Sequence, residues 1–216
     1  MTKVNETKQK ILDSANTLFA SFGYDGTSVR DIAKEAGVNL AAINYHFKNK
    51  ENLYCEVFNI NCEKIETGLR NVVNDNMSTS DFAVQVYKHF IENGNSLLNT
   101  FKIMLTGNVK IPDCHLHEDP ECFGPPGGDI LLAIITKEVG EDIPLDGRFW
   151  AMNMIFSHVT HMAIIMNTSI IKEKVQGMKH MTEAFKERNI SFHCTAVLDF
   201  LRNSPLNQWD STAFPE

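Results

Sequence analysis

The stretch TSVRDIAKEAGVNLAAINYHF, residues 27–47, predicts two short helices joined by a tight turn. Ser28 is a candidate N-cap for the first helix, and Asp31 stands three residues later, where a capping box places its acidic partner. Gly37 can relieve the backbone at the turn because glycine adopts positive φ at little cost, and Asn39 can cap the second helix. Two short helices in this order are the pattern of a helix-turn-helix, which other helical hairpins also show.

The rest of the chain is helical in its periodicity. Before the helix-turn-helix, apolar residues recur at the spacing of one helix face, at Ile11, Ala15, Leu18, Phe19 and Phe22. Within it, Ile43 and Phe47 are the inward positions of the second short helix, and a long helix is expected over about 51–74. No stretch alternates polar and apolar residues for long enough to require a strand. We therefore expect an all-α fold of about nine helices, with a three-helix N-terminal head and a larger helical body.

Charge is divided unevenly along the chain. The net charge is −7, yet residues 1–54 carry +1 and the remainder carries −8. Net charge bears on partners and solubility rather than on fold. The total excludes a polybasic, non-specific binder of nucleic acid. A near-neutral head on an acidic body remains compatible with a head that touches phosphate.

No segment of the sequence indicates export or a membrane. The first residues lack the apolar stretch of a secretory signal. The longest uninterrupted apolar runs, 130–135 and 162–166, are far short of the ~20 residues that span a bilayer. The five cysteines are odd in number and are expected to be reduced thiols. We expect a cytoplasmic protein with no membrane partner.

A longer set of residues agrees with a known family. These residues are Thr7, Ile11, Ala15, Leu18-Phe19, Gly23-Tyr24, Thr27-Ser28-Val29, Ile32-Ala33, Ala36-Gly37-Val38, Ile43-Asn44-Tyr45-His46-Phe47, Lys50-Glu51 and Leu53. Over about residues 6–54 they resemble the tetracycline-repressor (TetR) family, and Asn44–Phe47 is one variant of its aromatic block. The resemblance implies a homodimer that binds a roughly palindromic DNA operator and carries a small-molecule pocket in its body. Most members are repressors that a ligand releases from DNA, and none of this requires catalysis.

The resemblance also implies a division of the chain. We expect a DNA-binding helix-turn-helix domain over residues 1–50 and a connecting long helix over 51–74. An effector-binding and dimerisation domain is expected over 75–204, followed by a loose C-terminal tail over 205–216. A ligand that moves the connecting helix would change the separation of the two heads, which must match the spacing of the half-sites.

Contacts with DNA are expected from the second short helix and from helix N-termini. The residues expected to face bases are Leu40, Ala41, Ala42 and Asn44. The residues expected to contact phosphates, or to cap helices beside them, are Thr27, Ser28, Asn39, Tyr45, His46 and Lys50. Alternatives remain open for three positions: Tyr45 could pack in the core, His46 could cap its helix, and Lys48 could be a solvated lysine.

Dimerisation is expected through two helices, at about 145–167 and about 190–202. The first is apolar on most sides, which requires burial on most sides and hence a partner surface. The second has Ala196, Val197, Phe200 and Leu201 on one side, which would complete a four-helix interface. The alternative is that 145–167 is the central helix of a monomeric bundle.

An apolar or aromatic ligand is expected in the body. Adaptable apolar side chains favour such a cavity, and the candidate residues are Phe101, Met104, Leu105, Met152, Phe156, His158, His161 and Met162. The alternative for each is ordinary core packing. His158 and His161 lie three residues apart and could bind a metal, or be histidines bonded to backbone or water.

A loop rich in proline and glycine over 112–128 concentrates thiols and imidazoles. Its candidate metal ligands are Cys114, His115, His117 and Cys122. Their spacing matches no standard zinc motif. The alternatives are that Cys114 and Cys122 form a redox-active pair, or that the segment is an ordinary loop. A metal- or redox-responsive sensor using residues 114–122 is therefore the alternative function. We expect no enzyme, since no nucleophile, P-loop or HExxH pattern occurs, and no cofactor beyond the effector.

Overall fold

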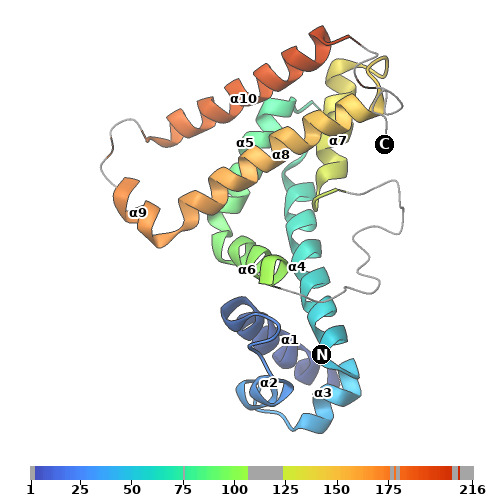
Figure 1. The fold of residues 1–216 in the computed structure, drawn as a ribbon, viewed down its shortest axis with the longest axis vertical. Coiled ribbons are helices and arrows are strands. Elements are labelled where there is room, and N and C mark those ends of the chain that lie inside the picture. The colour runs from blue at the N-terminus through green and yellow to red at the C-terminus, as the bar shows by residue number, and fades with distance from the viewer. Residues whose placement is uncertain are drawn as a thin grey trace. The chain divides into compact units, whose positions relative to one another are not determined.

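The structure is a computed structural model that describes residues 3–74, 76–106, 124–175, 178, 181–205 and 209. Within these ranges the chain forms ten helices and no strand, which confirms the all-α prediction with one helix more than expected (Figure 1). The helices are α1 Lys3–Phe22, α2 Val29–Glu35, α3 Leu40–Phe47, α4 Lys50–Val72, α5 Thr79–Glu92, α6 Gly94–Thr106, α7 Gly128–Val139, α8 Leu145–Asn167, α9 Ser169–Val175 and α10 Glu183–Asn203.

The described residues divide into two compact units. Residues 3–64 and 95–106 form the first, called here the head unit, and the remaining described residues from 65 onward form the body unit. The head unit thus contains α1 to α3, most of α4 and nearly all of α6. The expected divisions at 50, 74 and 204 concern function and stay predictions.

The head unit has one hydrophobic core. Ile11, Ala15 and Phe19 of α1 are fully buried in it, as the helical periodicity predicts. Phe22 was expected on the same face but is 64% exposed, because α1 ends there and the chain turns at Gly23, whose φ is +72°. The prediction for Phe22 was wrong, since periodicity continues only as far as the helix does.

Helix α6 contributes to the same core. Ile103 is completely buried among the apolar residues of α1 to α4. The hydroxyl of Tyr54, on α4, donates to the Ile103 carbonyl oxygen. The Tyr54 ring also lies edge-on to Phe19, with centroids 4.9 Å apart. This side chain therefore joins α1, α4 and α6 within the head unit.

The predicted helix caps are confirmed. The Ser28 hydroxyl accepts from the Asp31 backbone N–H at 3.1 Å, and the Asp31 carboxylate accepts from the Ser28 backbone N–H at 3.2 Å, which is the complete capping box. Asn39 caps α3 by accepting from the Ala42 N–H at 2.8 Å. Gly37, with φ +64°, makes the turn between α2 and α3.

Helix α8 is the central helix of the body unit. It packs against α5, α7 and α10 (Figure 1), and Ala151, Ile155 and Val159 are buried. By length and composition α8 would suffice to cross a membrane, but a core helix of a soluble protein passes the same test. Its neighbours cover much of its apolar surface within a single chain, as the bundle alternative requires.

Candidate nucleic-acid interface

Helix α3 separates buried from exposed residues. Ile43 and Phe47 are almost wholly buried in the head core, as predicted. The residues of α3 that are exposed are Leu40, Ala41, Asn44 and Tyr45, while Ala42 and His46 are half-buried. Burial of one face holds α3 against the head core, and the opposite face of the helix remains accessible to a partner.

Tyr45 projects from the head unit. Its side chain is 79% exposed, and its ring stands edge-on to His46 with centroids 5.1 Å apart. This exposure excludes the alternative in which Tyr45 packs in the core. Among the described residues no hydrogen bond joins the His46 ring to the end of α3, so the capping alternative for His46 finds no support. Both side chains can donate outward.

Thr27 lies inside the head unit rather than on its surface. The residue is 2% exposed, and its hydroxyl lies 2.8 Å from the Gly23 carbonyl oxygen and 3.2 Å from that of Leu18. The Thr27 hydroxyl, which we predicted from the sequence to contact a phosphate, therefore donates to carbonyl oxygens at the end of α1 instead. Thr27 differs from the expectation because it follows a turn that folds back on that helix.

Lys50 also differs from its expected position. Its Nζ donates to the carbonyl oxygens of Tyr24 at 2.8 Å and Thr27 at 2.9 Å, and it lies 3.9 Å from the centroid of the Tyr24 ring. Burial and then the nearby carboxylate of Glu51 raise the pKa of Tyr24, so its ring stays neutral beneath the ammonium. Lys50 thus ties the start of α4 to the segment before α2.

Ser28 is exposed but already bonded. Its hydroxyl donates to the Asp31 carboxylate at 2.5 Å. The hydrogen bonds from the Ser28 side chain and backbone lower the pKa of Asp31, which is therefore ionised. A phosphate at Ser28 would meet this negative charge. The sequence reading did not single out Arg30 and Lys34, which are exposed cations on α2; their positions on the outer side of a helix-turn-helix could have suggested them.

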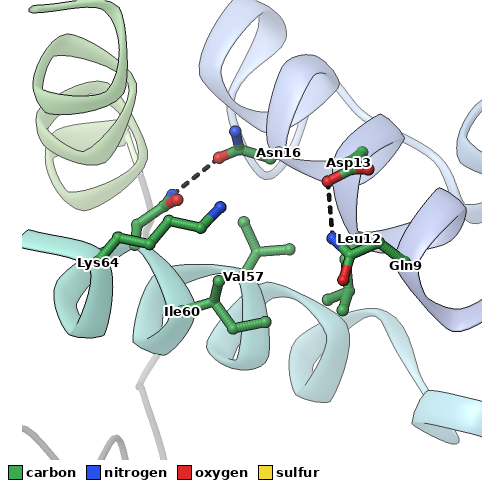
Figure 2. A pocket seen from close by; sticks show the side chains of 8 residues that line it. Gln9, Leu12, Asp13, Asn16, Val57, Ile60 and Lys64 are labelled. Atoms are coloured by element: carbon green, nitrogen blue, oxygen red, sulfur yellow. Dashed lines mark hydrogen bonds between the residues drawn. The ribbon is translucent and has the colours of Figure 1, made fainter. Parts of the chain in front are cut away.

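A small pocket lies in the head unit between α1 and α4 (Figure 2). Hydrogen bonds join Gln9 to Asp13 within α1 at 2.9 Å and Asn61 of α4 to Asn16 of α1 at 2.8 Å. The volume is about 20 Å³, enough for a water molecule and far too small for an organic effector. Its lining residues are Gln9, Leu12, Asp13, Asn16, Val57, Ile60, Asn61 and Lys64.

The eight residues expected to line an effector pocket fall in both units. Those of α6, which belong to the head unit, are Phe101, Met104 and Leu105; those of α8, in the body unit, are Met152, Phe156, His158, His161 and Met162. Leu105 is 77% exposed, whereas Met152 and Phe156 are buried. The two units therefore each hold part of the set. The body unit also has an open hollow of about 660 Å³, lined by α7, the start of α8 and the turn between them, that none of these residues lines.

His158 pairs with a residue that the sequence reading did not consider. Its ring stacks on that of His193 of α10, with centroids 4.0 Å apart, and its Nε2 lies 3.2 Å from Oδ1 of Asn189. Burial, followed by the charge of His193, lowers the pKa of His158. His161 is exposed. His158 is thus a bonded histidine between two helices.

The metal and redox alternatives rest mainly on residues outside the described ranges. Cys114, His115, His117 and Cys122 all lie there. Within the described ranges, no group of three or more His, Cys, Asp or Glu side chains could hold a metal ion. Cys194 is buried, and burial raises the pKa of its thiol to about 12, which makes it unreactive.

Residues 11–57 match the family described as bacterial regulatory proteins, tetR family. Residues 11–57 thus belong to the TetR family. It is 34% identical over 84 residues to the biofilm operon icaADBC HTH-type negative transcriptional regulator IcaR of Staphylococcus aureus, a match covering 39% of this chain and 43% of that protein. It is 46% identical over 70 residues to the probable HTH-type transcriptional regulator YttP of Bacillus subtilis, covering 31% and 34%. The matches span less than half of each relative.

The family fold extends beyond the matched segment. The transcriptional regulator FadR of Bacillus subtilis, solved with stearoyl-CoA, superposes with a TM-score of 0.58 at 18% identity, covering 91% of this chain and 98% of that one. At this identity the likeness concerns the fold alone. Membership of a family of regulatory proteins agrees with the expectation that the chain is not an enzyme.

Proposed function

We propose that the chain is a dimeric, DNA-binding repressor of transcription whose operator binding responds to a small apolar or aromatic ligand. The observation that carries the proposal is the division of α3, where Ile43 and Phe47 are buried and Asn44 and Tyr45 are exposed. A helix held by one face and open on the other is what insertion into a major groove requires. The family match over 11–57 includes all of α3.

The exposed face of α3 reads bases mainly through small contacts. Asn44 is its one amide, able to bond a base edge, and Ala41 is placed for a thymine methyl. Tyr45 and His46 donate to phosphates beside the groove. With so few strong base-reading side chains, sequence-dependent DNA shape contributes to specificity.

The proposed dimer uses the outer side of α10. Its exposed apolar residues are Phe185, Phe192, Ala196 and Phe200, and Met154 of α8 is exposed as well. Val197 and Leu201, which the sequence reading placed on the same side as Ala196 and Phe200, are buried within their own body unit instead. Exposed aromatic residues repeated along a helix are typical of an interface between subunits. A dimer would set two α3 helices at half-site spacing.

The proposed effector enters the apolar part of the body. The relative solved with stearoyl-CoA supports an apolar ligand of some length, and Met152 and Phe156 of α8 supply adaptable side chains for it. The ligand acts only through its different affinity for the DNA-binding and the released states.

A footprint on the DNA upstream of the protein's own gene tests the proposal. We expect protection of a roughly palindromic site. Replacing Asn44 and Tyr45 by alanine should weaken binding at least tenfold, since a good base contact alone contributes about 1–3 kcal/mol. Phe22→Ala is the matched control, because it removes an exposed aromatic side chain from the same unit. Binding unchanged in the double variant would contradict the assigned docking.

A further inference from the structure

The turn between α3 and α4 is strained at Lys48. Its φ is +67° and its ψ −51°, and it is the one residue other than glycine with positive φ in the part of the chain that the structure describes. The Asn49 N–H donates to the Phe47 carbonyl oxygen at 2.8 Å. These features define a γ-turn of the rare kind with positive φ.

The neighbours of Lys48 hold this turn in place. On one side, Phe47 is buried in the head core, and the Lys48 N–H closes α3 by donating to the Asn44 carbonyl oxygen at 3.0 Å. On the other side, the Asn49 side chain caps α4 by accepting from the Asn52 N–H at 2.8 Å. Strain of this kind persists where the surroundings determine it, and such positions cluster at functional sites.

Of the two lysines in the segment Lys48-Asn49-Lys50, one faces inward and one outward. The Lys50 ammonium is bonded to the carbonyl oxygens of Tyr24 and Thr27. The Lys48 side chain is exposed, and its ammonium makes no ion pair or hydrogen bond with the described residues. Of these two lysines, Lys48 is the one whose positive charge, at the C-terminal end of α3, is available to a partner.

We propose that Lys48 donates to a phosphate of the operator beside the end of α3, whereas Lys50 anchors the start of α4 within the head unit. The inference rests on the proposed DNA-binding function. Glycine adopts this φ without a steric penalty, whereas lysine keeps a charged side chain there at the expense of strain. The γ-turn fixes where that side chain leaves the backbone, immediately after the helix that enters the groove.

The test is the salt dependence of binding to a duplex that carries the protected site. Each phosphate contact contributes about 0.9 to the slope of log affinity against log salt concentration. We expect Lys48→Gln, which removes the charge, and Lys48→Gly, which also relieves the strain, to reduce the slope by about one per protomer. Lys48→Arg should retain it. Lys48→Gly should melt no lower than the wild type.

Two further variants separate contact from position. Lys10→Gln removes an exposed lysine from α1 and should leave the slope unchanged. Lys50→Met should lower the melting temperature of the head unit yet keep the wild-type slope when binding is measured well below that temperature. Wild-type slopes in both Lys48→Gln and Lys48→Gly would overturn the inference while leaving the proposed function intact. A wild-type protein that protects no DNA would overturn both.

Discussion

Thr27 is a polar residue of the head unit whose hydroxyl is directed inward. Replacing it by valine keeps the shape of the side chain and removes the hydrogen that the Gly23 and Leu18 carbonyl oxygens share. Because two part-buried acceptors lose this donor, we expect the free energy of unfolding to fall by about 1–3 kcal/mol. Urea denaturation followed by circular dichroism measures this loss.

Thr17→Val provides the matched control for Thr27→Val. Thr17 belongs to the same unit and donates to the Asp13 carbonyl oxygen at 3.1 Å, but it is exposed, so water can replace the bond. The change at Thr17 should stay within about 0.5 kcal/mol. Equal losses from both variants would contradict the structural role given to Thr27.

At the residue scale, spacing along the sequence predicted the hydrogen bonds that form between near neighbours in the chain. The capping box of Ser28 and Asp31 spans three residues, and the sequence contains all of it. The partners of Lys50 stand 26 and 23 residues earlier, at Tyr24 and Thr27, and they are backbone carbonyls that no residue type reveals. The sequence therefore identified Lys50 as important but not the contacts that it makes.

At the element scale, periodicity shows which residues share a side of a helix but not which side is covered. In α10 the sequence reading grouped Ala196, Val197, Phe200 and Leu201. The structure divides this set, because Val197 and Leu201 face the unit's own core and Ala196 and Phe200 face outward. Neighbouring positions on a helix differ by about 100°, so a boundary between buried and exposed surface can run between them.

The outer side of α10 allows a direct test of the proposed dimer interface. Phe192 lies on it and is 66% exposed. Phe192→Glu would place a charge in a desolvated interface, so we expect a monomer by size-exclusion chromatography with light scattering, with the helical content retained. Ala184→Glu adds the same charge to α10 at an exposed position away from this side and should remain dimeric. A Phe192→Glu dimer as stable as the wild type would contradict the proposed interface.

At the scale of the whole molecule, the sequence predicted the helical class and a distinct head but not the membership of each unit. Ile103 stands far from the helix-turn-helix in sequence, yet it is buried in the head core and accepts the Tyr54 hydroxyl through its carbonyl. Such long-range partners depend on the tertiary fold rather than on local pattern. For the same reason the expected pocket residues of α6 and α8, chosen by residue type, fall in two units.

The stability of the body unit should depend on pH through two half-buried histidines. Burial lowers the pKa of His158 and of His89 below the ordinary value of 6.5. His158 is faced by His193, whose charge lowers its pKa further, by Asn189, whose hydrogen bond opposes the shift, and by His161. In the folded state both rings therefore stay neutral to a lower pH than in the unfolded chain.

The sign of the effect follows from proton uptake. Well above pH 6.5 neither state binds protons at these rings, so their contribution is constant there. As the pH falls through 6.5 the unfolded chain takes up protons that the folded chain does not, so the free energy of unfolding decreases. Urea denaturation at pH 7.5, 6.5 and 5.5 should show this decrease, and the His89→Gln and His158→Gln double variant should show a smaller one. An equally steep decrease in the double variant would locate the pH dependence elsewhere.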